Sequence, residues 1–330
     1  MIIARGRELK PDPLVSVIIP AYNVAPFIAE TLDSVFAQSF GDYETIVVND
    51  ESPDTAELER AIAPYVERIV YIKQKNSGPG GARNSGIAHA RGEYVGFLDG
   101  DDAWDADFLA VQVEALTREP SLDLVCADAL LFGSSSHDGK RFFETVPTRE
   151  PVTLESLLAT ESSIITSGVL ARRSALEKAG LFDPQFYHSE DFDLWVRLVH
   201  RGGRIRYTRR CLARHRIHQT SLAYDSTRLL EGQSRVYRKL KRVLNPSERI
   251  ERLIDEQLRR CEATIALELG KRAFAQGDYA TAAEQITRAN AFYRSRKLSW
   301  LLAGLRFAPR LLHTLYRARQ RALPQRFAAA

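Results

Sequence analysis

The chain has 330 residues, of which 45% are hydrophobic and 27% are charged. This length is enough for about two domains, and the composition is typical of a folded globular protein, which excludes disordered and collagen-like classes. Lysine and arginine number 46 against 42 aspartate and glutamate residues, so the formal net charge is +4.

The charge is distributed unevenly along the chain. No Asp or Glu follows Glu284, whereas ten basic residues do. Subtracting this +10 from the total of +4 leaves −6 for residues 1–284. A mildly acidic body with a strongly basic tail predicts an anionic surface or partner for the tail.

Three features bear on the cellular compartment. Cys126, Cys211 and Cys261 are odd in number, lie far apart and have no metal-ligand spacing, which favours reduced thiols. The N-terminal segment MIIARGRELKPDP carries charges throughout, unlike a signal peptide. Arg306 and Arg310 interrupt the best apolar run, so no membrane span is predicted. We therefore expect a cytoplasmic protein, at most peripheral at the inner face of the membrane.

Residues 15–128 alternate between short β-branched runs and segments of helical periodicity. Strands are predicted at 15–20, 43–50, 68–73, 93–99 and 122–128. Helices are predicted at 25–40, 57–65, 81–90 and 105–118. Because strands that alternate with crossover helices pair in parallel, we expect a Rossmann-like α/β fold with a mostly parallel sheet flanked by helices.

The pattern changes after residue 130. RFFETV (141–146) and TSGVLAR (166–172) are predicted strands, and residues 203–218 are predicted to be rich in β-structure. Residues 174–180 form a predicted short helix that ends at a glycine. Residues 189–203 form a longer predicted helix with Ser189 as its N-cap.

Beyond Tyr224 the whole sequence predicts helix, so we divide the chain into a catalytic domain, 1–222, and a helical region, 223–330. Residues 267–289 resemble one tetratricopeptide-type helix pair, with Gly-Asp-Tyr at the turn and alanines where the helices would cross. One copy is too few for a solenoid. We therefore expect an all-helical C-terminal appendage.

Acidic residues follow two of the predicted strands, at the edge of an α/β sheet where ligands bind. Asp50 could accept a hydrogen bond from a base or a ribose, or could cap a turn. Asp99 and Asp101 lie two residues apart and can converge on a hard divalent cation that holds a diphosphate. The alternative is a solvated acidic turn that caps the next helix.

Three other segments contain candidate functional residues. Gly78 and Arg83 belong to a glycine-rich segment (76–90) that either binds an anion at a helix N-terminus or is a simple turn. This segment is neither a Rossmann fingerprint nor a phosphate loop. Glu190 and Asp191 either supply a general base or only complement the dipole of a first helical turn. His215 and His218 lie in an arginine-rich segment that has no nucleic-acid-binding motif.

Seven segments in this order resemble the family-2 inverting glycosyltransferases of GT-A fold, from about Val15 to Ser221. The matching segments are VSVIIPAYN, VVNDESPDT, NSGPGGARNSGI, EYVGFLDGDD, SGVLARRSALEKAGLFDP, SEDFDLWVRL and RIHQTS. The Gln-x-x-Arg-Trp signature of processive synthases is absent. The resemblance therefore implies transfer of one sugar or a few.

The resemblance also implies roles for individual residues. Asp50 matches the aspartate that holds the nucleotide base, usually uracil, and Asp99 and Asp101 match the Asp-x-Asp pair that binds ribose and the metal, Mn²⁺ or Mg²⁺. Asp191 matches the catalytic base, with Glu190 as the second candidate. The remaining assignments are a metal-site role for His218, a secondary metal role for Asp102, and donor-pocket roles for Pro20, Tyr22, Asn23, Gly78, Arg83 and Gly100.

The implied reaction is a single displacement from a nucleotide sugar, with a UDP-sugar favoured, to a hydroxyl of a glycan or lipid-linked acceptor. A sugar nucleotidyltransferase is disfavoured because PAYNVAP stands where a Gly-x-Gly-x-Arg loop would be expected. A non-catalytic scaffold that binds nucleotide sugars is the other alternative.

The basic tail interleaves apolar and arginine residues between Trp300 and Tyr316. Such a segment could lie on an anionic membrane surface. The alternatives are a packed helical subdomain and a homodimer contact, and Pro309 predicts a break in the helix.

Overall fold

The structure, a computed structural model, describes residues 2–133, 137–218 and 226–322. The chain divides into two compact units, Met1–Gln219 and Thr220–Ala330. The domain boundary predicted near residue 222, like the end of the last matching segment at Ser221, lies outside the described residues.

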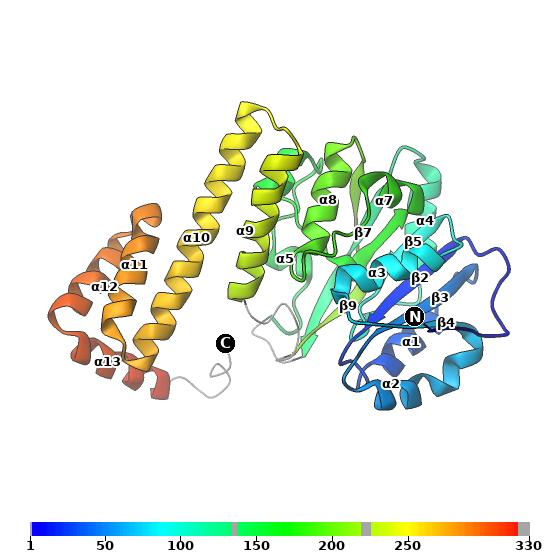
Figure 1. The fold of residues 1–330 in the computed structure, drawn as a ribbon, viewed down its shortest axis with the longest axis horizontal. Helices are drawn as coiled ribbons and strands as arrows, with labels where there is room; N and C mark the ends of the chain where they lie inside the picture. Colours follow the sequence, from blue (N-terminus) through cyan, green and yellow to red (C-terminus); the bar gives the residue numbers. More distant parts are fainter. Residues whose placement is uncertain (1, 134–136, 219–225, 323–330) are drawn as a thin grey trace. The chain divides into compact units, whose positions relative to one another are not determined.

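The described residues of the first unit form a nine-stranded sheet, in the order β1-β4-β3-β2-β5-β8-β7-β9-β6 (Figure 1). Its strands are β1 (Ile2–Arg5), β2 (Val15–Ala21), β3 (Tyr43–Asp50), β4 (Ile69–Gln74), β5 (Tyr94–Phe97), β6 (Ala103–Trp104), β7 (Leu124–Gly133), β8 (Val169–Arg172) and β9 (Ile205–Ile217). The five strands predicted between residues 15 and 128 are all present. The edge strands β1 and β6 were not predicted.

The pairing directions place six strand ends on one side of the sheet. Strands β4, β3, β2 and β5 are parallel neighbours. Strand β8 is antiparallel to both β5 and β7, so β7 has the same direction as β5, and β9 runs parallel to β7. The carboxyl ends of β4, β3, β2, β5, β7 and β9 therefore share one edge, where open α/β sheets bind ligands.

Both faces of the central strand β2 are covered. Val17, Ile18 and Ile19 have no exposed surface, although successive side chains of a strand point to opposite faces. Burial of this continuous apolar run explains why the segment forms a central strand with helices on both faces. The predicted α/β sheet flanked by helices is thereby confirmed.

The helices of the first unit connect the strands, and α3 crosses β2 and β3 (Figure 1). They are α1 (Ile28–Phe36), α2 (Thr55–Ile62), α3 (Gly78–His89), α4 (Phe108–Arg118), α5 (Phe142–Thr145), α6 (Leu154–Leu158), α7 (Arg173–Ala179) and α8 (Glu190–His200), with 3₁₀ turns at Ala63–Arg68 and Thr166–Gly168. Helix α7 ends as predicted at Gly180, whose φ of +90° is a left-handed conformation.

Gly86 allows α3 to pack closely on the sheet. A Cβ atom at this position would lie 2.4 Å from Cγ2 of Ile18 on β2. We expect Gly86→Ala to lower the free energy of unfolding by about 1–3 kcal/mol, because the overpacking outweighs the better helix propensity of alanine. Urea denaturation measures this loss. Gly41→Ala is the control, since nothing lies within 4 Å of its added Cβ, and equal stability of the two variants would contradict the prediction.

One of the predicted strands was wrong, and another was wrong in part. Residues 141–146 contain helix α5 and no strand, because the buried carboxylate of Asp128 accepts hydrogen bonds from the backbone N–H of Phe143 (2.9 Å) and from Nε of Arg141 (2.7 Å). In the segment 166–172 only Val169–Arg172 is a strand, and its first three residues form a 3₁₀ turn.

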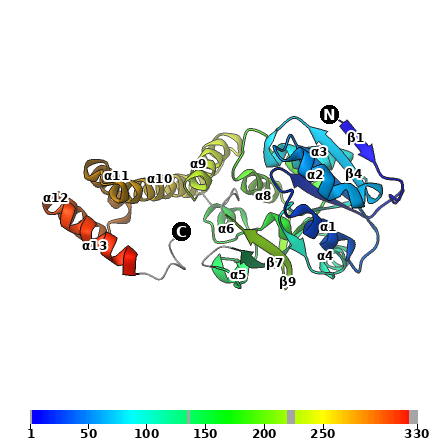
Figure 2. The same ribbon diagram turned by 90° about the horizontal axis from the view of Figure 1, so that it is seen from below.

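The second unit is helical, as predicted. Its helices are α9 (Ser226–Val243), α10 (Glu248–Gln276), α11 (Tyr279–Tyr293), α12 (Arg296–Phe307) and α13 (Pro309–Ala322). Helix α11 folds back along α10, and α12 and α13 follow it at the end of the unit (Figure 1 and Figure 2). Gly277 forms the predicted turn with a φ of +86°, and Asp278 caps α11 through Thr281.

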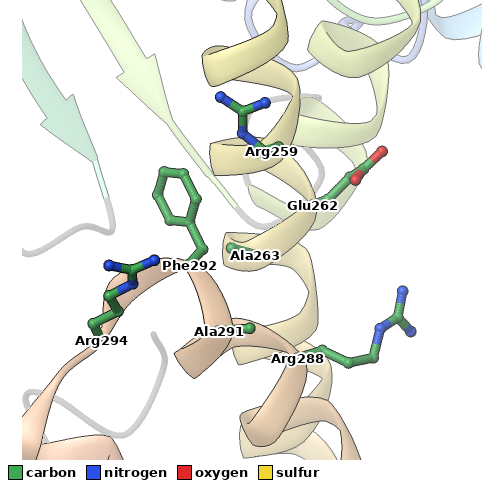
Figure 3. Close-up of a pocket in the computed structure, with 7 residues that line it drawn as sticks. All are labelled: Arg259, Glu262, Ala263, Arg288, Ala291, Phe292 and Arg294. Atoms are coloured by element: carbon green, nitrogen blue, oxygen red, sulfur yellow. The ribbon is translucent and has the colours of Figure 1, made fainter.

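A hollow of about 590 Å³ lies between α10 and α11 (Figure 3). Its lining residues are Arg259, Glu262, Ala263, Arg288, Ala291, Phe292 and Arg294. Glu262 is paired with Arg238 at 2.9 Å. No residue predicted to bind the donor or the acceptor lines this hollow.

None of the helices within residues 2–133, 137–218 and 226–322 combines the length and apolar character that a membrane span requires.

Candidate functional site

Asp50 ends β3 and is buried at the common sheet edge. Its Oδ1 accepts hydrogen bonds from Nε2 of Gln74, at the end of β4 (2.7 Å), and from the backbone N–H of Ser77, just before α3 (2.9 Å). The carboxylate therefore has a fixed position between two strand ends and a helix start. A carboxylate has about four acceptor sites, so further donors can bind it.

The glycine-rich segment forms the first turn of α3, which begins at Gly78 and not at residue 81 as predicted. Gly78 has a φ of +74°, and a Cβ there would lie 3.1 Å from Cδ2 of Tyr187. Glycine thus lets the ring of Tyr187 lie directly against the helix start. Tyr187 was not predicted from the sequence. The one available signal was that it is an aromatic residue close to Glu190.

Tyr187 and Tyr22 are two exposed aromatic residues near the sheet edge that contains Asp50. Their exposed fractions are 39% and 45%, which is high for aromatic side chains. The pKa of Tyr187 is raised, first by burial and then by the nearby Tyr22, Asp50 and Glu190. Tyr187 therefore lies near Tyr22, Asp50 and Glu190.

The loop after β2 is tied to the loop after β3, which places Tyr22. Asn23 has a φ of +56°, and its backbone N–H donates to Oγ of Ser52 (2.6 Å). The backbone N–H of Ala25 donates to Asp54 (2.8 Å). Pro20 lies in the last part of β2, and Tyr22 and Asn23 follow the end of this strand at the same edge as Asp50.

The acidic turn after β5 is held tightly by its surroundings. A Cβ at Gly100 would lie 3.0 Å from the carbonyl oxygen of Pro20, so only glycine fits there without a shift. Oγ1 of Thr31 donates to the carbonyl oxygens of Gly100 (3.0 Å) and Asp102 (2.7 Å). The turn therefore presents Asp99 and Asp101 from a rigid backbone.

Asp101 and His218 form a pair at this turn, with Oδ2 of Asp101 2.8 Å from Nε2 of His218. Within the described residues, no three His, Cys, Asp or Glu side chains form a complete metal site. The carboxylate nevertheless suits Mn²⁺ or Mg²⁺, which commonly bind through one or two carboxylates and take substrate phosphates as other ligands, and the imidazole favours the transition metal Mn²⁺ over Mg²⁺. The residues present therefore fit a divalent cation that arrives with a diphosphate.

Asp102 positions this pair, since its buried carboxylate accepts a hydrogen bond from the backbone N–H of Arg216 (2.8 Å) and lies 2.9 Å from Nδ1 of His215. Burial lowers the pKa of His215, but Asp102 together with Asp101 and Asp99 raises it by more, to about 9. The resulting ion pair ties the end of β9 to the acidic turn, and His218 follows β9 directly. Asp102 thus contacts the supporting residues of the site.

Asp191 and Glu190 begin α8, and their environments differ. Glu190 is buried, and its Oε1 lies 2.7 Å from Nη1 of Arg83. Asp191 is half-buried, with Oδ2 accepting from Oγ1 of Thr166 (2.8 Å) and Oδ1 from its neighbouring backbone N–H (2.7 Å). Of the two carboxylates, Asp191 is therefore the more exposed one.

Arg83 links the two acidic motifs. Its Nη2 lies 2.6 Å from Oδ1 of Asp99 while Nη1 contacts Glu190. Burial alone lowers the pKa of Arg83, but Asp99 and Glu190 raise it by more, so the guanidinium stays charged. The family resemblance implies a donor-pocket role for Arg83, and that role stays a prediction. In the structure its side chain joins the Asp99 turn to the start of α8.

The turn Thr166–Gly168 supports both motifs as well. Thr166 bonds Asp191, and Oγ of Ser167 accepts from the backbone N–H of Asp99 (3.2 Å). Sequence reasoning missed this role because the segment was interpreted as a strand. The predicted cap Ser189 has a φ of +64° and makes no side-chain cap hydrogen bond.

Glu190 gives the site a pH-dependent stability. Burial raises its pKa to about 7, with Arg83 lowering it and Asp191 raising it. The ordinary pKa of a glutamate is 4.5, so between these two values the folded chain holds the proton that the unfolded chain has released. The free energy of unfolding therefore falls as the pH rises through this interval.

We expect Glu190→Gln to remove this dependence. Relative to the variant, the wild type should lose on the order of 1–3 kcal/mol of unfolding free energy between pH 5 and pH 8. Urea denaturation at both pH values measures the difference, and Glu57→Gln at an exposed position serves as the control. A constant difference between wild type and Glu190→Gln would contradict the prediction.

The sequence matches the family model "Glycosyl transferase family 2" over residues 16–180, which is half of the chain. The uncharacterized glycosyltransferase RP339 of Rickettsia prowazekii is 30% identical over 67% of this chain and 69% of its own length. The putative teichuronic acid biosynthesis glycosyltransferase TuaG of Bacillus subtilis is 31% identical over 70% of this chain and 90% of its own.

Solved structures have the same fold. S. aureus TarS 1–349 in complex with UDP superposes with a TM-score of 0.57 at 18% identity, covering 94% of this chain and 92% of that one. The mannosyltransferase PcManGT of Pyrobaculum calidifontis, in complex with GDP-Man and Mn²⁺, superposes with a TM-score of 0.59 at 21% identity, covering 93% and 86%. The first unit has the α/β architecture of GT-A glycosyltransferases, and the chain belongs to glycosyl transferase family 2.

Proposed function

We propose that this glycosyltransferase moves a sugar from a nucleotide sugar, a UDP-sugar in the first instance, to a hydroxyl of a glycan or lipid-linked acceptor, with inversion. The observation that supports this most is the contact of Arg83 with both Asp99 and Glu190. This contact brings the turn proposed to hold the donor next to the helix start that provides the base. The reaction needs the two to be adjacent.

The donor nucleotide is assigned to the edge formed by β2, β3 and α3. Asp50 accepts a hydrogen bond from the base, and the rings of Tyr22 and Tyr187 provide flat surfaces beside it. Asp99 accepts from the ribose. The TarS structures with UDP and with UDP-GlcNAc, and the PcManGT structure with GDP-Man, support a nucleotide sugar as the donor class.

The diphosphate is assigned to Asp101 and His218, with Asp99 beside them, through Mn²⁺ or Mg²⁺. When bound, the cation neutralises the charge that builds up on the departing nucleoside diphosphate. Thr31 holds the backbone of the acidic turn, and Asp102 ties this turn to the end of β9 next to His218. The Mn²⁺ in the PcManGT structure supports this choice of metal.

Asp191 is assigned as the general base. Thr166 orients its carboxylate, and Glu190 is turned away toward Arg83, so one carboxylate faces the acceptor side. It removes the proton of the acceptor hydroxyl while the oxygen attacks the anomeric carbon and the diphosphate leaves from the opposite face. A single displacement of this kind inverts the anomeric configuration.

The test is release of nucleoside diphosphate from a panel of UDP-, TDP- and GDP-sugars with Mn²⁺, in the presence and absence of acceptor extracts. The proposal predicts release from at least one donor and a product whose anomeric proton coupling in NMR shows inversion. A product of retained configuration would contradict the single displacement. No release from any donor would favour the non-catalytic alternative.

A further inference from the structure

We propose that the end of the helical unit binds the surface of an anionic membrane through four exposed apolar residues. These are Trp300 and Phe307 on α12, and Leu311 and Leu315 on α13, together called the outer apolar face. The proposal concerns the second unit alone and does not depend on the function proposed for the first.

The inner side of α12 is already occupied by its own unit. Leu305 is 4% exposed and belongs to a buried cluster with Ala273, Phe274, Ala282 and Ile286. Trp300 and Phe307 are seven residues apart, and so on the same side of the helix, and they are 78% and 83% exposed. Because Leu305 lies on the opposite side by helical spacing, the packing of α12 leaves these two aromatic rings in solvent.

Helix α13 has the same arrangement. It begins at Pro309, which ends α12 as predicted. Its inner side holds His313, which is 8% exposed and bonded through Nδ1 to the hydroxyl of Tyr279 at 2.7 Å. Leu311 and Leu315, four residues apart on another side of the helix, are 62% and 59% exposed. The predicted packed subdomain thus explains the inner sides of the two helices and not the outer ones.

The positive charges around this face favour an anionic partner. Exposed basic residues flank it on both helices, namely Arg296, Lys297, Arg306, Arg310 and Arg317. No acidic residue follows Glu284, whereas residues 1–284 have a net charge of −6. Large apolar side chains between basic ones are the pattern of helices that lie in the headgroup region of anionic bilayers. Since neither helix can span a bilayer, the occupant that fits is the membrane surface.

The experiment is flotation of the full-length protein with vesicles. One set consists of phosphatidylcholine, and the other adds phosphatidylglycerol. We expect binding to the anionic vesicles, at least about tenfold weaker binding to the neutral ones, and loss of binding at high salt. Equal binding to both vesicle types, or binding to neither, would overturn the proposal.

Paired variants test whether vesicle binding depends on the outer apolar face or on any exposed apolar or basic residue. Trp300→Ser with Phe307→Ser should weaken binding at least about tenfold. The control combines Val66→Ser and Val243→Ser, two exposed apolar residues outside the face, and should bind like the wild type. For charge, Arg306→Ser with Arg310→Ser should weaken binding more than Arg60→Ser with Arg118→Ser. Equal losses in either comparison would overturn the assignment to this face.

A second copy of the chain is the competing occupant. Sedimentation of the Trp300→Ser, Phe307→Ser variant and the wild type without vesicles distinguishes the two. The membrane proposal predicts the same oligomeric state for both proteins. A wild-type dimer that the substitutions convert to a monomer, with vesicle binding unchanged, would assign the face to self-association instead.

Discussion

Asp191→Asn should reduce sugar transfer by about 10²–10⁴-fold and leave donor affinity nearly unchanged. The asparagine keeps the size of the side chain and can still accept the hydrogen bond from Thr166, but it cannot take a proton at neutral pH. Glu190 cannot replace it, because its carboxyl is buried against Arg83. Turnover and calorimetric titration with the donor and Mn²⁺, on the same preparation, measure both quantities.

Asp42→Asn is the matched control for this substitution, since it makes the same chemical change at an exposed surface carboxylate. It should transfer sugar at the wild-type rate. If Asp191→Asn lost donor binding together with turnover, the carboxylate would belong to the donor site and the assignment as base would be wrong.

Asp101→Asn should abolish metal-dependent donor binding. Removing an outer-shell partner of a metal typically costs about 10–100-fold in affinity, and loss of a charged direct ligand should exceed that. The pair with His218 would be lost as well, since the remaining amide is a weaker partner for the imidazole. Donor titration in Mn²⁺ and in a chelator measures the effect.

The two binding experiments have different expected patterns. Wild type should lose affinity for the donor when Mn²⁺ is removed, whereas Asp101→Asn should bind weakly in both conditions. Donor binding by Asp101→Asn that still strengthened with Mn²⁺ would place the metal elsewhere.

The fold of the first unit was largely predictable from apolar patterning. The run Val15–Ala21 is buried on both faces, so its continuous apolar sequence indicated a central strand. The α5 segment was mistaken for a strand because its conformation depends on Asp128, thirteen residues or more away in the chain. A contact between residues this far apart cannot be predicted from the local sequence. Edge strands such as Ala103–Trp104 are too short to give a pattern.

Site residues that belong to a sequence motif were predictable. Residues that reach the site only through the tertiary fold were not. Asp50, Asp99, Asp101 and Asp191 were singled out because acidic residues follow strands or begin a helix. Thr166 has no such signal, and its hydrogen bond to Asp191 spans 25 residues.

The link through Arg83 could not be predicted either. Glu190 is 107 residues away from Arg83 in the sequence, and Asp99 is 16 away. A single arginine in a glycine-rich segment suggests an anionic ligand on chemical grounds. Only the packing of α3 against the start of α8 shows that the guanidinium of Arg83 is paired with protein carboxylates.

The central claim is that the shared sheet edge binds a nucleotide sugar through a divalent cation held by Asp101 and His218. Thermal unfolding with a panel of nucleotide sugars in Mn²⁺ tests it most directly, because a ligand that binds the folded state raises the melting temperature. We predict that at least one donor raises the melting temperature of the wild type and not that of Asp101→Asn. A panel in which no donor stabilises the wild type, or in which a donor stabilises both proteins equally, would contradict the claim.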